Sequence, residues 1–365
     1  MKFVDDYRNN EISKNIIRKI NEEFSYDVIK RKINIMEVCG THTMSIYKNN
    51  IDALLPGNIN LISGPGCPVC VTSKGFIDSA IDLCANDKVI ICTFADMLKV
   101  PGSHGSLRSG KNKKNNIITI YSPLDCLSIC ENNKDKEIIF LGVGFETTAP
   151  IIGLTIKRAY EKNINNFSVL CNLKTMPNVM KKILLDKDTE IHGFICPGHV
   201  GSIIGNNAFN KLANEYKVPM VMTGFEHTDI IYAIYSLCNM IENKKHICEN
   251  EYKRIVKNEG NKKCIKVLED VFEIENEYWR GLGLIKNSGL RITEKYKKYD
   301  AMKKFSIKEE YKEDPLSCIC KDIIKGIKKP YECKFFKNKC NPNNPIGPCM
   351  VSSEGSCANY LKYKT

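Results

Sequence analysis

The sequence predicts an α/β protein built from two parallel-sheet units. Short β-branched runs end in loops containing Gly, Cys or Thr, and a segment with helical spacing follows each of them. Strands that alternate with helices favour parallel sheets covered on both faces. The number of expected strands indicates two such units. The strands are expected at 32–38, 59–63, 89–93, 137–143, 167–170, 191–196 and 218–223.

The length and composition predict a soluble chain of two or three domains. The chain has 365 residues, of which 43% are hydrophobic, and no apolar run approaches the ~20 residues that span a bilayer. The opening residues, MKFVDDYRNN, have no apolar stretch behind their charges, so no secretory signal is expected. We therefore predict a cytoplasmic protein with no membrane partner.

The formal charge of +12 is concentrated towards the C-terminal end of the chain. The last 65 residues contain 13 Lys against 7 Asp and Glu, a balance that can steer an acidic protein partner. Solvated surface lysines are the simpler explanation. No motif of stacking aromatic and basic side chains accompanies the charge, so no nucleic-acid partner is predicted.

Eighteen cysteines indicate metal or redox chemistry where they cluster, because the cytoplasm keeps thiols reduced and disfavours a static disulfide framework. Isolated cysteines within apolar runs are expected to be small core residues instead. These are Cys84, Cys92, Cys171, Cys196 and Cys238.

Side chains suited to metal binding or acid–base chemistry follow most of the expected strands. Ligands of open parallel sheets bind outside the carboxyl ends of the strands. We therefore expect these side chains to line a common cleft. They are Cys39 and His42 after the first strand, Cys67 and Cys70 after the second, Asp96 after the third, Glu146 after the fourth and His199 after the sixth.

The segment GFETT at 144–148 has an echo, GFEHT, at 224–228. Both place a carboxylate, Glu146 or Glu226, at a strand-to-helix turn, where helix capping and catalysis are equally open. GVGFETT lacks the third glycine of the dinucleotide fingerprint, and no P-loop pattern occurs. Nicotinamide and P-loop nucleotide chemistry are therefore disfavoured.

Cys39 and His42 form a C-x2-H pair, and Cys67 and Cys70 form a C-x2-C pair in ISGPGCPVCVT. A structural zinc site fits the Cys3His set, and turn chemistry alone explains the Gly and Pro residues. Structural zinc usually stabilises small domains without a core, whereas these pairs end core strands. A C-x-x-C pair at a helix N-terminus has a lowered thiol pKa. We therefore favour a redox or metal-binding role.

The C-terminal 50 residues carry the densest group of cysteines and few apolar side chains. Six thiols suit one [4Fe–4S] cluster with four ligands and one further pair. A single zinc ion is the second possibility, and three disulfides fit the number of thiols but not the compartment. The six are Cys318, Cys320, Cys333, Cys340, Cys349 and Cys357.

Together these motifs resemble the HypD family of hydrogenase maturation proteins. The resemblance rests on CGTH, GPGCPVC, GFETTAP, PGHVGS, TGFE, WRGLG and CMVSSEG, which occur in family order from about residue 33 to the C-terminus. Three positions depart from the family pattern: Gly201 stands where Ser is common, His227 where Pro is usual, and Lys321 where Gly is usual. Lys321 would alter only the tuning of a nearby cluster.

The resemblance implies two Rossmann-like α/β domains and a third domain, cysteine-rich and mostly helical or irregular, that carries a [4Fe–4S] cluster. It implies four segments. Residues 1–31 form a helical segment that packs on the C-terminal domain, 32–133 the first α/β domain, 134–240 the second, and 241–365 the iron–sulfur domain.

The resemblance also implies a role in [NiFe]-hydrogenase maturation. With a HypC-like chaperone, such a protein holds the iron on which the Fe(CN)2CO unit is assembled for the hydrogenase large subunit. Cyanide arrives from HypE as a thiocyanate, and HypF acts before HypE. The expected protein is a redox-active assembly factor rather than a conventional turnover enzyme.

Residue roles follow from the same resemblance. Cys39 would be the iron ligand, with His42 nearby, and Cys67 and Cys70 the dithiol beside it. Glu354 of CMVSSEG belongs to the implied reactive residues. In the tail, the cluster ligands would be Cys318, Cys333, Cys340 and Cys357, and the adjacent redox pair Cys320 and Cys349.

Reductive cleavage of a thiocyanate C–S bond needs two electrons, which a Cys pair can hold, and thiolates suit low-spin iron. The expected relay runs from the cluster to Cys320/Cys349, then to Cys67/Cys70, then to the iron at Cys39. Two alternatives remain: a passive iron scaffold without electron transfer, and a zinc-binding interaction module.

Overall fold

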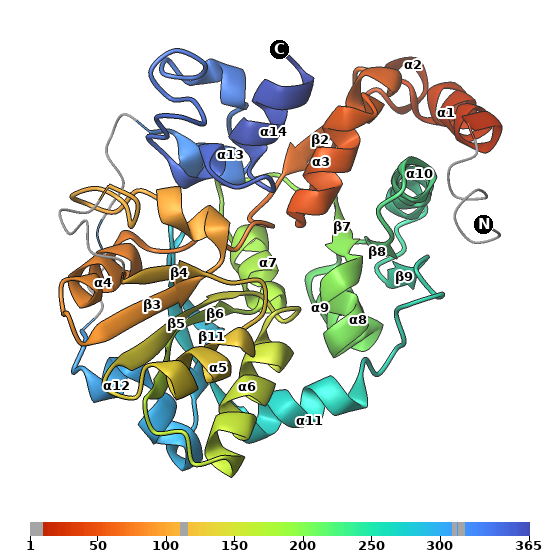
Figure 1. Ribbon diagram of the computed structural model, residues 1–365. Helices are drawn as coiled ribbons and strands as arrows, with labels where there is room; N and C mark the ends of the chain where they lie inside the picture. Colours follow the sequence, from red (N-terminus) through yellow and green to blue (C-terminus); the bar gives the residue numbers. More distant parts are fainter. Residues whose placement is uncertain (1–9, 110–115, 309–311, 313–317) are drawn as a thin grey trace.

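The computed structural model describes residues 10–109, 116–308, 312 and 318–365. Within them, two sheets and a cysteine-rich tail make up the protein (Figure 1). Sheet A has the strand order β2-β1-β7-β8-β9, and sheet B has the order β10-β11-β6-β5-β3-β4. The predicted α/β class, with two mainly parallel sheets and a cysteine-rich region, is confirmed.

Sheet A is parallel at every strand pair. In β1, Ile33 and Ile35 pack towards α1, α3 and α10, whereas Met36 faces the opposite core with α9. A strand covered on both faces needs apolar side chains on both, which is why the apolar residues of β1 do not simply alternate with polar ones. The strands are β1 (Ile33–Glu37), β2 (Ile59–Ser63), β7 (Gly193–Pro197), β8 (Met220–Thr223) and β9 (Cys248–Asn250).

Sheet B joins four parallel strands to an antiparallel hairpin. The seven predicted strands all occur, but β4, β9 and the hairpin β10–β11 were not predicted. Much of β10 is exposed, so it lacks the apolar run that marks a buried strand. The strands of sheet B are β3 (Val89–Thr93), β4 (Ile117–Thr119), β5 (Glu137–Gly144), β6 (Phe167–Lys174), β10 (Phe272–Trp279) and β11 (Gly283–Ile292).

Helices cover both faces of each sheet. On sheet B, α5 and α6 pack on one face and α4 and α7 on the other. No helix in the described ranges is long and apolar enough to cross a membrane. The helices are α1 (Asn10–Phe24), α2 (Tyr26–Ile29), α3 (Gly40–Lys48), α4 (Lys74–Cys84), α5 (Asp125–Asn132), α6 (Ala149–Glu161), α7 (Met176–Leu184), α8 (Gly198–Ile204), α9 (Asn206–Tyr216), α10 (His227–Glu242), α11 (Lys262–Val271), α12 (Ala301–Lys304), α13 (Cys320–Ile324) and α14 (Ser356–Tyr363).

The sheets do not follow the contiguous segments 32–133, 134–240 and 241–365. The first segment gives β1 and β2 to sheet A but β3 and β4 to sheet B, and β7 returns to pair with β1. The third segment supplies the β10–β11 hairpin to sheet B. Strand pairing between distant segments overrides the division along the chain, so the predicted boundaries do not describe the sheets.

The N-terminal helix packs on α10, and not on the C-terminal domain as predicted. Ile20 and Phe24 of α1 join the apolar cluster of α10, and the Phe24 and Tyr235 rings meet edge to face at 5.8 Å. The Ser13 and Thr228 hydroxyls are 2.8 Å apart. The apolar face of α1 therefore covers sheet A. Residues 1–9 of the predicted segment lie outside the described residues.

The isolated cysteines are core residues, as predicted. Cys92, Cys171, Cys196 and Cys238 are almost fully buried, and the half-buried Cys84 packs against the core.

Candidate functional site

A cavity of about 300 Å³ lies where strands of both sheets end. Cys39 and Pro197 line it from the ends of β1 and β7 in sheet A, and Asp96 and Phe145 line it from the ends of β3 and β5 in sheet B. His199 and the tail loop 352–354 complete this part of the wall. The structure thus brings together three of the predicted cleft residues, and adds Glu354 from the tail.

Cys39 is the N-cap residue of α3 and is 7% exposed. Its N–H donates to Glu37 Oε2 at 2.9 Å. Two glycines let neighbouring segments of the chain pack closely against Cys39. A Cβ on Gly66 would lie 2.2 Å from Cys39 N, and a Cβ on Gly40 would lie 2.2 Å from the Glu354 Cβ. Neither position has room for a side chain, so the glycines of CGTH and GPGC bring the loop after β2 and the tail against Cys39.

The free Cys39 thiol is held in its protonated form. Burial raises its pKa to about 12, the carboxylates of Glu354 and Glu37 add to the rise, and the N–H groups of Thr41 and His42 oppose it. Glu354 itself has a raised pKa because of burial and the nearby Asp96. A metal ion that binds Cys39 must therefore displace its proton, and its positive charge would offset the two carboxylates.

His42 lies behind the cavity in a stack of three rings. Phe225 stacks on His42 at 4.8 Å and on His199 at 3.9 Å between ring centroids. His42 Nε2 donates to the Gly224 carbonyl at 2.8 Å, and burial lowers the pKa of His42 to about 4, so the ring is neutral. His42 thus supports the cavity wall, and His199 is the histidine that lines the cavity.

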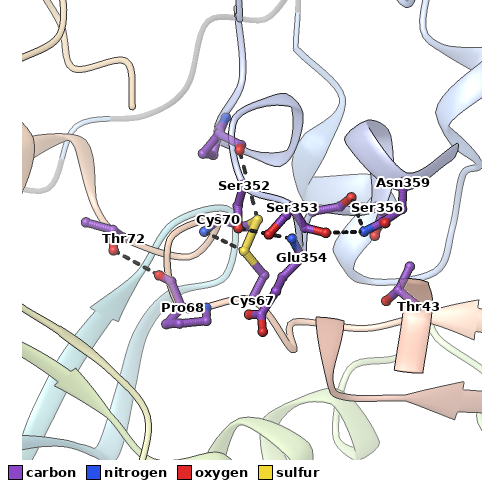
Figure 2. Close-up of a disulfide and its surroundings, with 12 residues drawn as sticks. Thr43, Cys67, Pro68, Cys70, Thr72, Ser352, Ser353, Glu354, Ser356 and Asn359 are labelled. Atoms are coloured by element: carbon purple, nitrogen blue, oxygen red, sulfur yellow. Dashed lines mark hydrogen bonds between the residues drawn. A yellow bond between two sulfur atoms is a disulfide. The ribbon is translucent and has the colours of Figure 1, made fainter. Parts of the chain in front are cut away.

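Cys67 and Cys70 form a disulfide in the turn after β2 (Figure 2). Both are 4% exposed, and Cys70 Sγ lies 4.0 Å from the carbonyl oxygen of Pro348 in the tail. The predicted helix N-terminus is not at this pair: α4 begins at Lys74, with Ser73 as its N-cap residue. No helix N-terminus in the described chain therefore lowers the pKa of these thiols, whereas the pairing itself fits a reversible dithiol.

Five of the six tail cysteines gather around Cys320. Its thiol interacts with those of Cys318, Cys349 and Cys357. The pKa of Cys357 is also raised by electrostatic interaction with Cys340. Hydrogen bonding with Cys318 and Cys349, together with burial, raises the pKa of Cys320 well above its usual value. Cys333 makes no hydrogen bond or electrostatic contact with these thiols in the described part of the tail.

The tail thiols suit an iron–sulfur cluster in chemical kind. A Cβ on Gly347 would lie 2.6 and 2.7 Å from the sulfurs of Cys318 and Cys320, so only glycine lets the chain pack this closely against them. The Ile346 N–H donates to Cys340 Sγ at 3.4 Å, a contact typical of sulfur ligands. No three His, Cys, Asp or Glu side chains among the described residues already stand in a metal-binding arrangement. The thiols would therefore have to turn towards a cluster.

Glu146 and Glu226 both act at helix N-termini. Glu146 Oε1 accepts from the N–H of Met176, the first residue of α7, at 2.8 Å. Glu226 is the N-cap residue of α10 and forms a capping box with Asp229. Neither lines the cavity. The structure therefore supports the capping interpretation of both.

Glu146→Gln should stabilise the protein above neutral pH but not in acid. Burial raises the pKa of Glu146 from 4.5 to about 7, so between these values the unfolded state loses a proton that the native state keeps. Native stability therefore falls as pH rises through this window. One pKa unit corresponds to about 1.4 kcal/mol. The unfolding free energy of the Gln variant, relative to that of the wild type, should therefore increase by up to about 3 kcal/mol as pH rises through this window. Urea unfolding at pH 5 and pH 8 measures it.

The exposed Glu161→Gln at the C-terminal end of α6 is the control and should show no such growth. An equal effect of Glu146→Gln at both pH values would contradict the raised pKa.

Several residues of the site were not predicted from the sequence. Phe225 separates the two histidine rings, and the other four line the cavity without a charge or thiol to draw attention. Their positions in the sequence could have indicated them, since each lies within one of the motifs GFETT, TGFE or CMVSSEG. The residues are Thr147, Thr148, Phe225, Ser352 and Ser353.

The fold and site define an α/β protein with a thiol at a cavity between two sheets. A disulfide lies beside the cavity, and a thiol-rich tail forms part of its wall. The HypD family model, described as "Hydrogenase formation hypA family", matches residues 11–364. The chain belongs to this family of hydrogenase maturation factors.

Three relatives illustrate the match. The chain is 39% identical to hydrogenase maturation factor HypD2 of Bradyrhizobium diazoefficiens and 39% identical to HypD of Rhizobium leguminosarum bv. viciae. These alignments cover 100% of this chain and 97% and 96% of the relatives. HypD of Escherichia coli K12 is 37% identical, over 100% of this chain and 98% of its own.

Proposed function

We propose that this hydrogenase maturation factor holds the iron on which an Fe(CN)2CO unit is assembled. Its partners would be a HypC-like chaperone that shares the iron, HypE as the cyanide carrier with HypF before it, and the hydrogenase large subunit as the indirect recipient. The observation that carries the proposal is the position of Cys39. It is the one cysteine that lines the cavity among the described residues, and the tail and the disulfide loop close around it.

The cyanide step requires two electrons at this cavity. When the C–S bond of a carrier-bound thiocyanate breaks, the carrier sulfur leaves as a thiol and the cyanide carbon binds iron. Cys67 and Cys70 in their dithiol form would supply the two electrons and become the disulfide seen in Figure 2. Pro68 and Val69, between the two cysteines, line the cavity, so the donor lies next to the reaction.

Cys320 and Cys349 would return the disulfide to its dithiol. A Cys349 thiolate attacks the Cys67–Cys70 bond, Cys320 then attacks Cys349, and the products are a Cys320–Cys349 disulfide and a Cys67/Cys70 dithiol. Support comes from the interaction of Cys320 with Cys349, and from the 4.0 Å contact of Cys70 Sγ with Pro348, the residue before Cys349.

A [4Fe–4S] cluster in the tail would supply electrons one at a time to the Cys320/Cys349 pair. By resemblance, its ligands would be Cys318, Cys333, Cys340 and Cys357. Three of them lie in the thiol group around Cys320, and Cys333 must move to join them.

Cys70→Ser should separate the electron relay from iron binding. A single thiol cannot form the intramolecular disulfide, so hydrogenase maturation should fall to background. Iron at Cys39 and the tail cluster should remain, because Cys39 and the tail thiols are unchanged. Anaerobic iron and sulfide analysis combined with a hydrogenase activity assay in a strain lacking the native gene measures both.

Cys238→Ser, a substitution in the core of α10, controls for the loss of any buried thiol. Normal maturation by the Cys70→Ser variant would favour the passive-scaffold alternative. Loss of a tightly bound zinc together with unfolding would instead favour the structural zinc alternative.

A further inference from the structure

The turn between β5 and α6 forms a polar part of the cavity wall. Phe145, Thr147 and Thr148 line the cavity, whereas Glu146 between them turns away and caps α7. Thr147 is exposed and Thr148 is half-buried, as expected for side chains that border an open cavity.

Both threonine hydroxyls are free to bind a ligand. Threonine in the first turns of a helix commonly bonds to a nearby backbone group. Thr155, further along α6, does so and donates to the Ile151 carbonyl at 2.8 Å. Across the described ranges, Thr147 Oγ1 and Thr148 Oγ1 make no hydrogen bond, and Thr148 gives α6 no side-chain cap. Two neighbouring O–H donors therefore remain available at the cavity.

The turn that carries these hydroxyls is fixed on three sides. A Cβ on Gly144 would lie 2.5 Å from the Thr148 Cβ, so only glycine lets Thr148 fold back over the end of β5. Phe145 stacks on Trp279 at 5.7 Å, and Glu146 is bonded to the first N–H of α7. Such anchoring presents the two hydroxyls in a defined geometry rather than on a mobile loop.

The cyanide ligands of the proposed iron unit need hydrogen-bond donors. The nitrogen of a metal-bound cyanide carries partial negative charge and accepts hydrogen bonds, whereas the oxygen of bound CO accepts them poorly. The carboxylates of Asp96 and Glu354 in the same wall are acceptors when ionised and cannot serve such a nitrogen. The Thr147–Thr148 pair offers one donor for each of two cyanides.

We propose that Thr147 and Thr148 donate hydrogen bonds to the cyanide nitrogens of the iron unit held at Cys39, and so orient that unit in the cavity. This inference rests on the proposed function. It assigns to the GFETT turn the recognition of cyanide, and to Cys39 only the retention of iron.

The test compares two double variants by infrared spectroscopy of anaerobically purified protein co-expressed with its maturation partners. In Thr147→Val/Thr148→Val, iron should initially bind at Cys39, but the CN stretches should shift to lower wavenumber and the CO band should move less. The iron unit should also dissociate at least about tenfold faster, since two hydrogen bonds to charged groups are lost. Thr147→Ser/Thr148→Ser keeps both hydroxyls and should restore the wild-type band positions.

A matched control is Thr155→Val, which removes a hydroxyl within α6, away from the cavity, and should leave the bands unshifted. If the double Val variant is poorly folded, the single Thr147→Val change at an exposed position should still shift a CN band. Unshifted CN bands with unchanged dissociation in folded Val variants would overturn this inference alone. The absence of CN bands from wild-type protein that contains iron would overturn the proposed function and this inference with it.

Discussion

Cys39→Ala should abolish iron retention at the cavity and remove the CN and CO infrared bands. A methyl group cannot ligate iron, and Cys39 is the thiol that lines the cavity in the described chain. The cavity-bound iron should fall more than tenfold, which corresponds to a loss of at least about 1.4 kcal/mol in binding free energy. The tail cluster should stay, because Cys39 belongs to a different group of residues. Iron analysis and infrared spectra of anaerobically purified protein measure the effect.

Cys84→Ala is the control, because this half-buried thiol of α4 does not line the cavity. Retention of both CN and CO bands by Cys39→Ala would rule out Cys39 as the iron ligand.

Cys340→Ala should remove the tail cluster and loosen residues 318–365. The tail contributes few apolar side chains to the core, among them Ile323, Ile324 and Met350. Metal-binding energy would therefore supply much of its folding free energy, as in small metal-dependent domains, where it reaches about 10 kcal/mol. Iron–sulfur absorbance should disappear, and limited proteolysis should cut within the tail while both sheets remain resistant.

Cys333→Ala should have the same effect if the family resemblance assigns the ligands correctly. Its thiol stands apart from the other five in the described tail, so this variant tests whether the tail closes when the cluster binds. Cys264→Ala on α11 is the control for both variants. Unchanged absorbance and protease resistance in Cys340→Ala would refute a cluster-dependent tail.

The sheets and the cleft were predictable because their signal is local. A parallel strand covered on both faces needs an apolar run, and all seven predicted strands occur. The end of a strand fixes where the next residue lies, so Cys39, Asp96 and His199 were correctly predicted to meet at one cavity.

The remaining features depend on pairing between distant segments. The β10–β11 hairpin is largely exposed, so its sequence does not show which sheet it joins. The pairing of β1 with β7 and the packing of α1 on α10 join residues far apart in the chain. Glu146 illustrates the same limit in the site: its sequence position suggested the cleft, but its side chain turns to cap α7.

The most direct test of the account is the metal content and infrared spectrum of the wild-type protein, purified without oxygen after co-expression with its maturation partners. We expect iron, acid-labile sulfide, and both CN and CO stretches in one sample. Tightly bound zinc with neither iron nor sulfide, and a spectrum without these bands, would contradict it.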